Sequence, residues 1–440
     1  MEKYVVISPS EVISAIYDQW YLFVLLSCII SFVLASLVKN MSLGFMDPIH
    51  FFWTFTFGTS YSIVVLLFLN DFIDIYLFLI VIIYFFTLIL FMYVGYYSKK
   101  INFDLKLVDN FCSINTAIKI LFFLIFMYLV FLVYYVISVN WNVFFISRFE
   151  ANRGIGFIAR ILDVLRLFVI YFLAVYCVHK KNLLSVVFLF VFLIVSSFFN
   201  GAKFSILESV YLILIVYCIF LGKNIKINIK NTFKFSVLVI FVLSFSLFFT
   251  NKLAIEIGYS SNYTNLPPAV EMLLSRIIAN GDIYYMGMVN NLVFTLSDKI
   301  SSFFELVARP YLGYELTKYI FDSNNDSLNI GRAVWEYWYP YSVSGGSIDH
   351  FDIAAFAYFG LFGGVAFVSM MGFFLGRINK YKKKLMYDTR KNILNIGFFS
   401  IIYIKCYLLL LSPVVAITTM FDIFLCFILL NMILILMKKG

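Results

Sequence analysis

Long apolar runs, each about as long as a bilayer is thick, recur along this chain and limit what it can fold into. A bilayer core of roughly 30 Å is crossed by a helix of about 20 apolar residues. The 440 residues are 63% hydrophobic and only 13% charged, with a mean hydropathy of +0.96, which is too apolar for a soluble protein of this length. The sequence predicts an all-α polytopic integral membrane protein with about eleven transmembrane helices (ten to twelve): 19–38, 49–70, 76–97, 117–138, 161–178, 183–199, 204–221, 235–251, 351–376, 392–411 and 415–437.

Lysine-rich connections between the apolar runs indicate the orientation of the chain. With eleven spans, the main lysine clusters all fall on one side: 99–100, 180–181, 223–234, 380–384 and 438–439. Because short positively charged connections stay in the cytoplasm, we expect this side to be cytoplasmic, with the N-terminus outside and the C-terminus inside. The chain then divides into about eight N-terminal spans with one external loop, a large external loop, and about three C-terminal spans: residues 1–251 (loop 139–160), 252–350 and 351–440.

Arginine and lysine are sorted to opposite sides in this arrangement. Seven of the nine arginines lie outside or near the outer surface, and four of them stand in "SRFEANRGIGFIARILDVLR", residues 147–166. The arginine fork matches phosphate geometry, so we predict an external anion site around Arg153, Arg160 and Arg166. A cation within a span costs roughly 2.5–3.5 kcal/mol, and it usually faces a cavity or a partner. The alternative is solvated loop charges, or ion pairs with carboxylates of the outer side: Glu150, Asp163 and Glu271.

A tight external turn, "SSFFNGAKFSILES" at 196–209, carries a further cation. Asn200–Gly201 is expected to end one helix, and Lys203 then stands at the start of the next. A lysine and a helix N-terminus are both positive, so together they would attract an anion. The alternative is a lysine that extends to the membrane interface, with Glu208 as its partner.

The external loop 252–350 is too long for a passive connection. Three helices are expected to pack on the outer face or over a cavity mouth: "NLPPAVEMLLSRIIANGD", "DIYYMGMVNNLVFTL" and "SDKISSFFELVARP". Aromatic residues then cluster around Glu336: Trp335, Tyr337, Trp338, Tyr339 and Tyr341. Aromatic rings stack on the apolar faces of sugars, which predicts a sugar-binding surface, and the alternative is an interfacial aromatic belt.

His350 stands between Asp349 and Asp352, where the external loop returns to the membrane. We expect it at the outer surface, where a histidine can transfer a proton or help to hold a phosphate. The alternative is an interfacial histidine without a chemical role. A metal site has little support, because no second histidine or cysteine lies nearby.

Three local stretches, together with the order of spans and loops along the chain, resemble a known family. They are "NGAKFSIL" at 200–207, "RIIANGDIYY" at 276–285, and "DHFDIAAFAYFGLFGG" at 349–364, which ends in a G-x-x-G pattern. With many spans and one large external loop late in the chain, the sequence resembles the Wzy-type O-antigen polymerases and, more distantly, the O-antigen ligases. The ligases carry a histidine just before the return to the membrane, and His350 occupies the matching place.

The resemblance implies a metal-independent membrane glycosyltransferase of GT-C-like architecture in the bacterial inner membrane. Such an enzyme transfers a glycan from undecaprenyl pyrophosphate to the non-reducing end of a lipid-linked repeat unit on the periplasmic side, in lipopolysaccharide biosynthesis. A chain-length-regulating co-polymerase is the implied protein partner, and no nucleotide, other cofactor or nucleic acid is expected. The predicted pyrophosphate-binding cations are Arg153, Arg160, Arg166, Lys203, Arg276, Arg309 and Arg332. The predicted base is His350, then Asp349, Asp352 or Glu336. The predicted sugar-binding rings are Trp335, Trp338 and Tyr339.

Three other functions remain open. An O-antigen ligase would perform similar chemistry on a lipid A-core acceptor. A flippase or exporter of lipid-linked sugars would show internal repeats and charges spread through its spans, whereas few charges stand within these spans, among them Glu208, Lys405 and Asp422. A membrane acyltransferase would use a histidine buried among the spans, and it ranks last because His350 is expected at the surface.

Overall fold

The chain is almost entirely helical in its computed structural model, and no strand occurs among the residues described. These residues are 6–44, 47–98, 112–146, 151–152, 154–200, 204–222, 268–296, 300–321, 329–342, 345–387 and 392–439. Within these ranges nine helices are long and apolar enough to cross a membrane: α2 (Trp20–Val38), η1 with α3 (His50–Phe55 and Thr56–Leu69), α4 (Ile75–Tyr97), α5 (Ile114–Ser138), α8 (Gly156–Lys180), α9 (Leu183–Asn200), α18 (Phe351–Tyr387), α19 with η4 (Ile393–Lys405 and Cys406–Leu410) and α20 (Pro413–Lys439).

The predicted class, an all-α polytopic membrane protein, is therefore confirmed. Nine of the predicted spans match these helices, and the predicted span 204–221 is the shorter apolar helix α10 (Phe204–Leu221). The predicted span 235–251 lies outside the described residues. Two bounds were wrong: α8 begins earlier, at Gly156, and α18 continues through the polar stretch after Gly376 to Tyr387.

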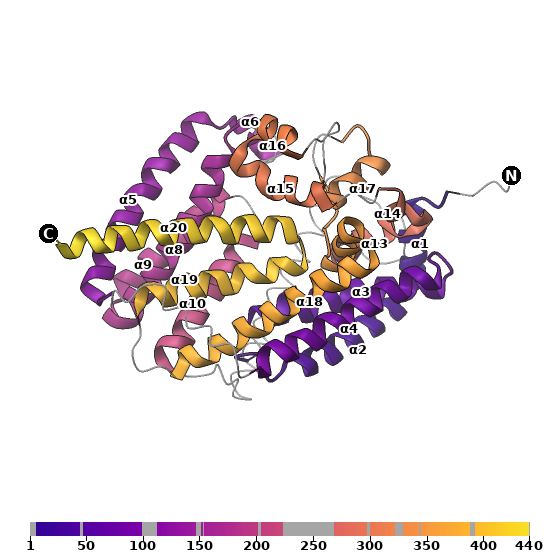
Figure 1. Cartoon of the computed structure of the whole chain (residues 1–440), viewed down its shortest axis with the longest axis horizontal. Helices are drawn as coiled ribbons and strands as arrows, with labels where there is room; N and C mark the ends of the chain where they lie inside the picture. The colour runs from indigo at the N-terminus through magenta and orange to yellow at the C-terminus, as the bar shows by residue number, and fades with distance from the viewer. Residues whose placement is uncertain are drawn as a thin grey trace.

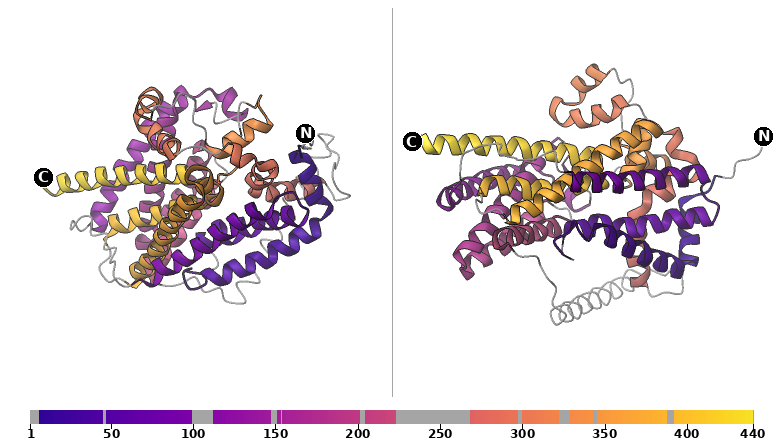
Figure 2. Two further views of the ribbon diagram at one scale, coloured as in Figure 1. Left: turned by 45° about the vertical axis from the view of Figure 1, so that its right-hand side comes forward. Right: turned by 60° about the horizontal axis from the view of Figure 1, so that its bottom comes forward.

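The long helices form two groups (Figure 1). α2, α3, α4 and α18 pack together in one group, and α5, α8, α9, α10, α19 and α20 make up the other. α18 and α19 contact α10, which joins the groups. In all views α1 (Pro9–Asp18) and the C-terminal end of α20 lie at opposite ends of the molecule (Figure 2).

Glycines allow α4 and α18 to approach very closely. A Cβ added at Gly376 would overlap the carbonyl oxygen of Met92, and one at Gly95 would overlap that of Phe373. Gly372 faces the backbone of Leu88 in the same way. Lipid chains are as apolar as leucine, so helices in a membrane associate through close packing of this kind. This contact anchors the first group of helices.

α18 is interrupted at Gly360, inside the predicted G-x-x-G return to the membrane. Gly360 has φ 66° and ψ −174°, which a residue with a Cβ rarely adopts. The hydroxyl of Tyr84 lies 3.0 and 3.1 Å from the carbonyl oxygens of Gly360 and Leu361. A side chain of α4 therefore satisfies backbone groups that the break would leave without partners in an apolar environment.

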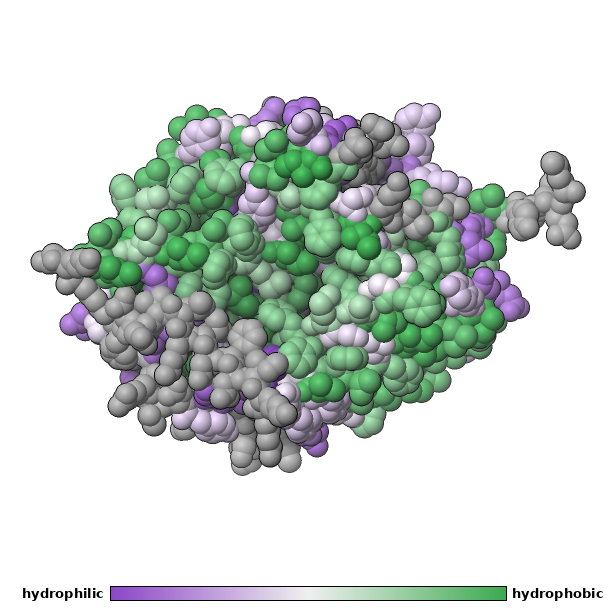
Figure 3. Space-filling view, viewed as in Figure 1, coloured by the Kyte–Doolittle hydropathy of each residue, from purple (hydrophilic) through white to green (hydrophobic). Residues whose placement is uncertain are grey.

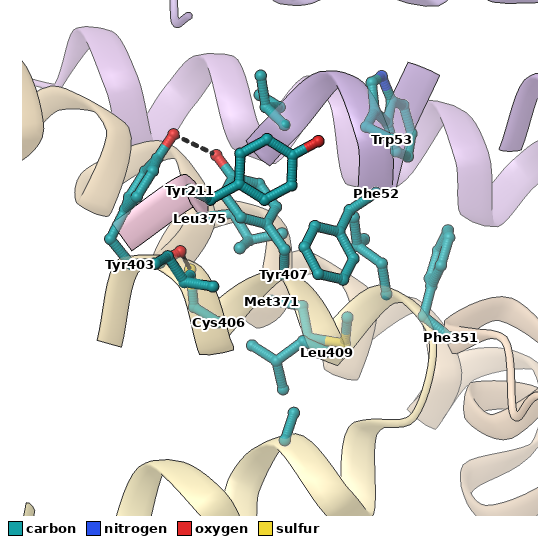
Figure 4. Packing of buried hydrophobic residues seen from close by; sticks show 14 of the residues in the cluster. Phe52, Trp53, Tyr211, Phe351, Met371, Leu375, Tyr403, Cys406, Tyr407 and Leu409 are labelled. Carbon is teal, nitrogen blue, oxygen red and sulfur yellow. Dashed lines mark hydrogen bonds between the residues drawn. The ribbon is translucent and has the colours of Figure 1, made fainter. Parts of the chain in front are cut away.

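A buried ion pair lies within the first group at the lysine-rich end, and Tyr403 of α19 connects it to the second group. Lys382 Nζ lies 2.6 Å from Asp47 Oδ2, and both side chains are fully buried. Lys382 also donates to Asn379 at 3.0 Å, and Tyr403 donates to Asp47 at 2.5 Å. The hydroxyl of Tyr407 donates to that of Tyr403 at 3.2 Å (Figure 4). A buried charge is tolerated when it is paired and hydrogen-bonded, as both charges are here.

The segment 252–350, which the sequence predicts to be external and which is called the external segment below, contains short helices, as predicted, although the second predicted helix is broken. They are α12 (Pro268–Ile278), α13 (Asp282–Gly287), α14 (Leu292–Thr295), α15 (Ile300–Leu312), α16 (Tyr314–Phe321) and α17 (Ile330–Trp338). The single helix predicted over 282–296 was wrong, because Asn290 and Asn291 adopt left-handed φ values of 60° and 57°. The Asn290 side chain exchanges hydrogen bonds with the Ile7 backbone at 3.1 and 2.8 Å, which stabilises this break.

Candidate functional site

An apolar groove opens between α5, α8 and α20. Its volume is about 440 Å³, and among the described residues Arg160 and Asp422 are the only charged ones in a lining that is otherwise apolar. On the face shown in Figure 3, hydrophobic side chains cover most of the surface around α20. A groove of this kind accommodates a hydrocarbon chain, and the two charged residues mark its polar end.

Arg160 and Asp422 form a bidentate ion pair at that end. Asp422 accepts hydrogen bonds from Arg160 Nε at 2.9 Å and from Nη2 at 2.6 and 2.7 Å. The side chains are 28% and 17% exposed, so they can be reached from outside. Tyr311 donates to Asp422 at 3.0 Å, and its ring lies under the guanidinium, with 4.7 Å from Arg160 Cζ to the ring centroid. Tyr311 belongs to α15, so a helix of the external segment contacts the polar end of the groove.

One Arg160 nitrogen faces away from the carboxylate. Nη1 donates to the carbonyl oxygen of Pro310 at 3.2 Å. A guanidinium has five N–H donors in a rigid fork, of which Nη1 carries two. Arg160 can therefore meet a second anion through Nη1 while it keeps its contact with Asp422.

Arg166 lies in a buried network of four charges. Its Nη2 is 2.7 Å from Asp163 and 2.9 Å from Glu208, and Lys405 Nζ is 3.2 and 2.7 Å from the same two carboxylates. The network joins α8, α10 and α19, and two positive charges balance two negative ones. Glu208, the predicted partner of Lys203, is thus bound by Arg166 and Lys405. Arg166 is only 1% exposed, so it cannot contact a large external substrate without rearrangement.

A small polar cavity adjoins the network. Its volume is about 60 Å³, and its polar lining includes Tyr128, Asn152, Arg166, Ser196 and Asn200. Asn200 donates to Asp163 at 2.8 Å, which connects the end of α9 to the charges. The cavity is large enough for a few water molecules and too small for a sugar.

His350 is fully buried, so the expectation that it lies at the outer surface was wrong. The hydroxyl of Tyr284 lies 3.1 Å from His350 Nδ1 and 2.8 and 3.0 Å from the two Asp352 oxygens. Tyr61 on α3 also donates to Asp352, at 3.3 Å. Phe57 and Phe351 pack around these groups, which removes them from water. The surface position was the reason for ranking the acyltransferase last, and that reason does not hold.

Burial also shifts the protonation of the groups beside His350. It lowers the pKa of His350 to about 3, which keeps the ring neutral at physiological pH. It raises the pKa of Asp349 and of Asp282 to about 7 each, against the opposing effect of backbone N–H groups. Asp349 accepts from Gly331 N at 2.5 Å, and Asp282 accepts from Ile348 N at 3.0 Å. Both carboxylates hold the backbone of the external segment in place.

The remaining predicted anion-binding residues are spread over the external segment. Arg332 donates to Glu336 at 2.6 Å and to the carbonyl oxygens of Gly345 and Ser342 at 2.8 and 2.9 Å, so its guanidinium braces the loop after α17. Arg309 pairs with Glu305 at 2.5 Å, and Arg276 is exposed in the last turn of α12. Arg153 and Lys203 lie outside the described residues.

The aromatic cluster of α17 is partly built into the fold. Trp338 Nε1 donates to the carbonyl oxygen of Met286 at 2.9 Å, and Trp335 Nε1 donates to Ser342 Oγ at 3.2 Å. The rings of Trp335 and Tyr339 lie 4.8 Å apart, centroid to centroid. Tyr337 and Tyr339 remain exposed. The exposed rings can meet a ligand, whereas the indole nitrogens hold the external segment together.

At the groove, the structure brings together one predicted residue, Arg160, and one that was not predicted as a site residue, Asp422. Asp422 stands 262 positions from Arg160 in the chain, and the sequence signal for it was an acidic residue within an apolar span. Among the described residues no group of three or more His, Cys, Asp or Glu side chains could hold a metal ion.

Comparisons of this chain with protein-family models, with characterised proteins and with solved structures find no match.

Proposed function

We propose that this protein is a membrane glycosyltransferase that uses a polyprenyl-pyrophosphate-linked oligosaccharide, as the resemblance to O-antigen polymerases implies. The observation that carries the proposal is the groove between α5, α8 and α20, with the Arg160–Asp422 pair at its polar end. A lipid-linked sugar likewise has an apolar part and a charged part, because its long hydrocarbon chain ends in a pyrophosphate. The hydrocarbon would lie in the groove, and the pyrophosphate would meet Arg160.

Arg160 would bind the leaving pyrophosphate through Nη1, the nitrogen that faces away from Asp422. Negative charge develops on the departing oxygen as the bond from the anomeric carbon to that oxygen breaks. A fixed guanidinium at the membrane surface stabilises this charge more than water does. The bond's electron pair leaves with the lipid pyrophosphate.

Asp422 would accept the proton of the acceptor hydroxyl, whose oxygen forms the new bond to the anomeric carbon. This carboxylate lies beside Arg160 and is partly exposed. Of the predicted bases, Asp349, His350 and Asp352 are buried, and Glu336 is partly exposed but lies on α17, where it pairs with Arg332. Tyr311, which donates to Asp422, would orient it. The products are an extended glycan, a free lipid pyrophosphate and a protonated carboxyl group, so atoms and charge balance. In the remaining parts of the proposal, the reaction takes place on the periplasmic side of the bacterial inner membrane, and a co-polymerase regulates chain length.

The first test is extension of a lipid-linked repeat unit from the native strain by the purified full-length protein, followed on a gel. The expected product is a ladder of longer lipid-linked chains without added nucleotide. Arg160→Ala and Asp422→Asn should each reduce extension by 10²-fold or more, since one charge-stabilising or proton-accepting group contributes about that much. Wild-type protein that leaves the repeat unit unextended would refute the polymerase proposal. Extension only after lipid A-core is added would identify a ligase instead.

A matched pair of variants tests the groove itself. Leu429 lines the groove, whereas Met432, on the same helix and similarly exposed at 57% against 59%, does not. Leu429→Trp should fill the groove and raise the substrate concentration needed for half-maximal rate, and Met432→Trp should leave it unchanged. Equal behaviour of the two variants would show that the hydrocarbon chain lies elsewhere.

A second candidate function, a transporter of lipid-linked sugars, gains support from the buried charges. Charged residues inside spans often mark a transport path, and Asp163, Arg166, Glu208 and Lys405 contact one another within the bundle. In liposomes, a transporter would move the repeat unit across the bilayer without lengthening it. Lengthening without movement would exclude this function.

A further inference from the structure

A second apolar groove lies on another face of α20. It is bounded by α18, α19 and α20, has a volume of about 360 Å³, and is lined by aromatic and aliphatic side chains with one cation, Arg377. On α20 it uses Ile417, Phe421 and Phe424, which share a face at the helical step of 100°. The first groove uses residues such as Leu429 and Ile433 of a different face. The two grooves are therefore separate sites.

Two cations of α18 lie close together, and one of them, Arg377, lines the second groove. Arg377 Nη1 and Lys380 Nζ donate to the same carbonyl oxygen, that of Ser98, at 2.9 and 2.6 Å. No carboxylate pairs with either cation in the part of the chain that the structure describes. Two like charges that share one neutral acceptor leave a local excess of positive charge.

Arg377 is nearly buried and is not fully hydrogen-bonded. Its side chain is 5% exposed, and its Nε has no hydrogen-bond partner among the described residues. A buried donor without a partner costs about 1–3 kcal/mol, more when it is charged. A ligand that accepts a hydrogen bond from this group would remove that cost.

We propose that the second groove binds an anionic phospholipid. One acyl chain would occupy the space between Phe374, Phe398 and Phe424, and the phosphate would accept hydrogen bonds from Arg377, with the charge of Lys380 close by. Basic pockets between transmembrane helices on the cytoplasmic side bind anionic lipid headgroups by this combination of charge and apolar contact. The site lies at the end of α18 that the lysine distribution assigns to the cytoplasm, where such phospholipids are the abundant lipid phosphate. The proposal does not depend on the glycosyltransferase reaction.

The test uses full-length protein purified in detergent and depleted of lipid. Phosphatidylglycerol and phosphatidylcholine with identical acyl chains are added in separate titrations, and thermal unfolding and native mass spectrometry report binding. Phosphatidylglycerol should raise the unfolding temperature, and phosphatidylcholine should have little effect. Arg377→Gln should bind phosphatidylglycerol at least about tenfold more weakly, because it removes a charged hydrogen-bonding group. Lys180→Gln, which removes an exposed charge from the same side, should bind like the wild type.

A second pair of variants keeps the proposal testable if Arg377→Gln does not fold. Met420 lines the groove, and Met370 on α18 is exposed and does not. Met420→Trp should abolish the phosphatidylglycerol effect, whereas Met370→Trp should preserve it. Three results would overturn the proposal: equal stabilisation by the two phospholipids, unchanged binding in Arg377→Gln and Met420→Trp, or binding of undecaprenyl phosphate where phosphatidylglycerol does not bind.

Discussion

Removing one carboxylate from the buried four-charge network should severely destabilise the protein. Glu208→Gln leaves Arg166 and Lys405 facing a single carboxylate, Asp163, so the interior gains one uncompensated positive charge. Breaking a buried ion pair by removing one partner costs about 3–5 kcal/mol. Total stabilities of about 5–15 kcal/mol are usual for folded domains, so the loss is a large fraction of what holds the protein together.

The measurement is the free energy of unfolding in detergent micelles, from denaturant titration followed by circular dichroism. The control is Glu336→Gln, which breaks a partly exposed pair within one helix and should cost less than about 1 kcal/mol. Arg166→Met with Glu208→Gln removes one charge of each sign and leaves the Asp163–Lys405 pair. The double variant should therefore be destabilised by less than the sum of the two single variants.

Two results would refute this reasoning. If Glu208→Gln cost no more than Glu336→Gln, water or another group must compensate the positive charge. If the two substitutions were additive, Arg166 and Glu208 would not interact in the membrane. With either result, Arg166 would again be a candidate for binding an external anion.

The other predictions concern helix packing and pH. Gly376→Val should destabilise the protein by about 1–3 kcal/mol, because its side chain would overlap the Met92 carbonyl oxygen, whereas Gly156→Ala, which meets no neighbour within 4 Å, should have almost no effect on thermal unfolding. Asp349 and Asp282 have pKa values raised to about 7 by burial, so the folded state binds more protons than the unfolded state between about pH 4 and pH 7. Stability should therefore fall as pH rises through that window, and Asp349→Asn should flatten the profile of unfolding temperature against pH; an unchanged slope would contradict this.

Some of the aromatic cluster could be anticipated from sequence and some could not. The clustering of aromatic residues at 335–341 is visible in the sequence, whereas the helix that carries the first of them, α17, was not predicted. The sequence could not predict which indole nitrogens donate hydrogen bonds within the protein. The acceptor of Trp338, for example, is the Met286 carbonyl oxygen, 52 positions away.

The sequence by itself determined the class of the protein and most of its helices. Burial of an apolar run in a bilayer is a local free-energy term, so the spans and the return to the membrane near Phe351 can be recognised without knowing their neighbours. Only the tertiary structure decided which charges meet. Arg160 pairs with Asp422 of the last helix, and His350 is enclosed by Phe57 and Tyr284. These contacts depend on how helices distant in the chain pack and rotate against each other, and neither residue spacing nor hydropathy records that packing.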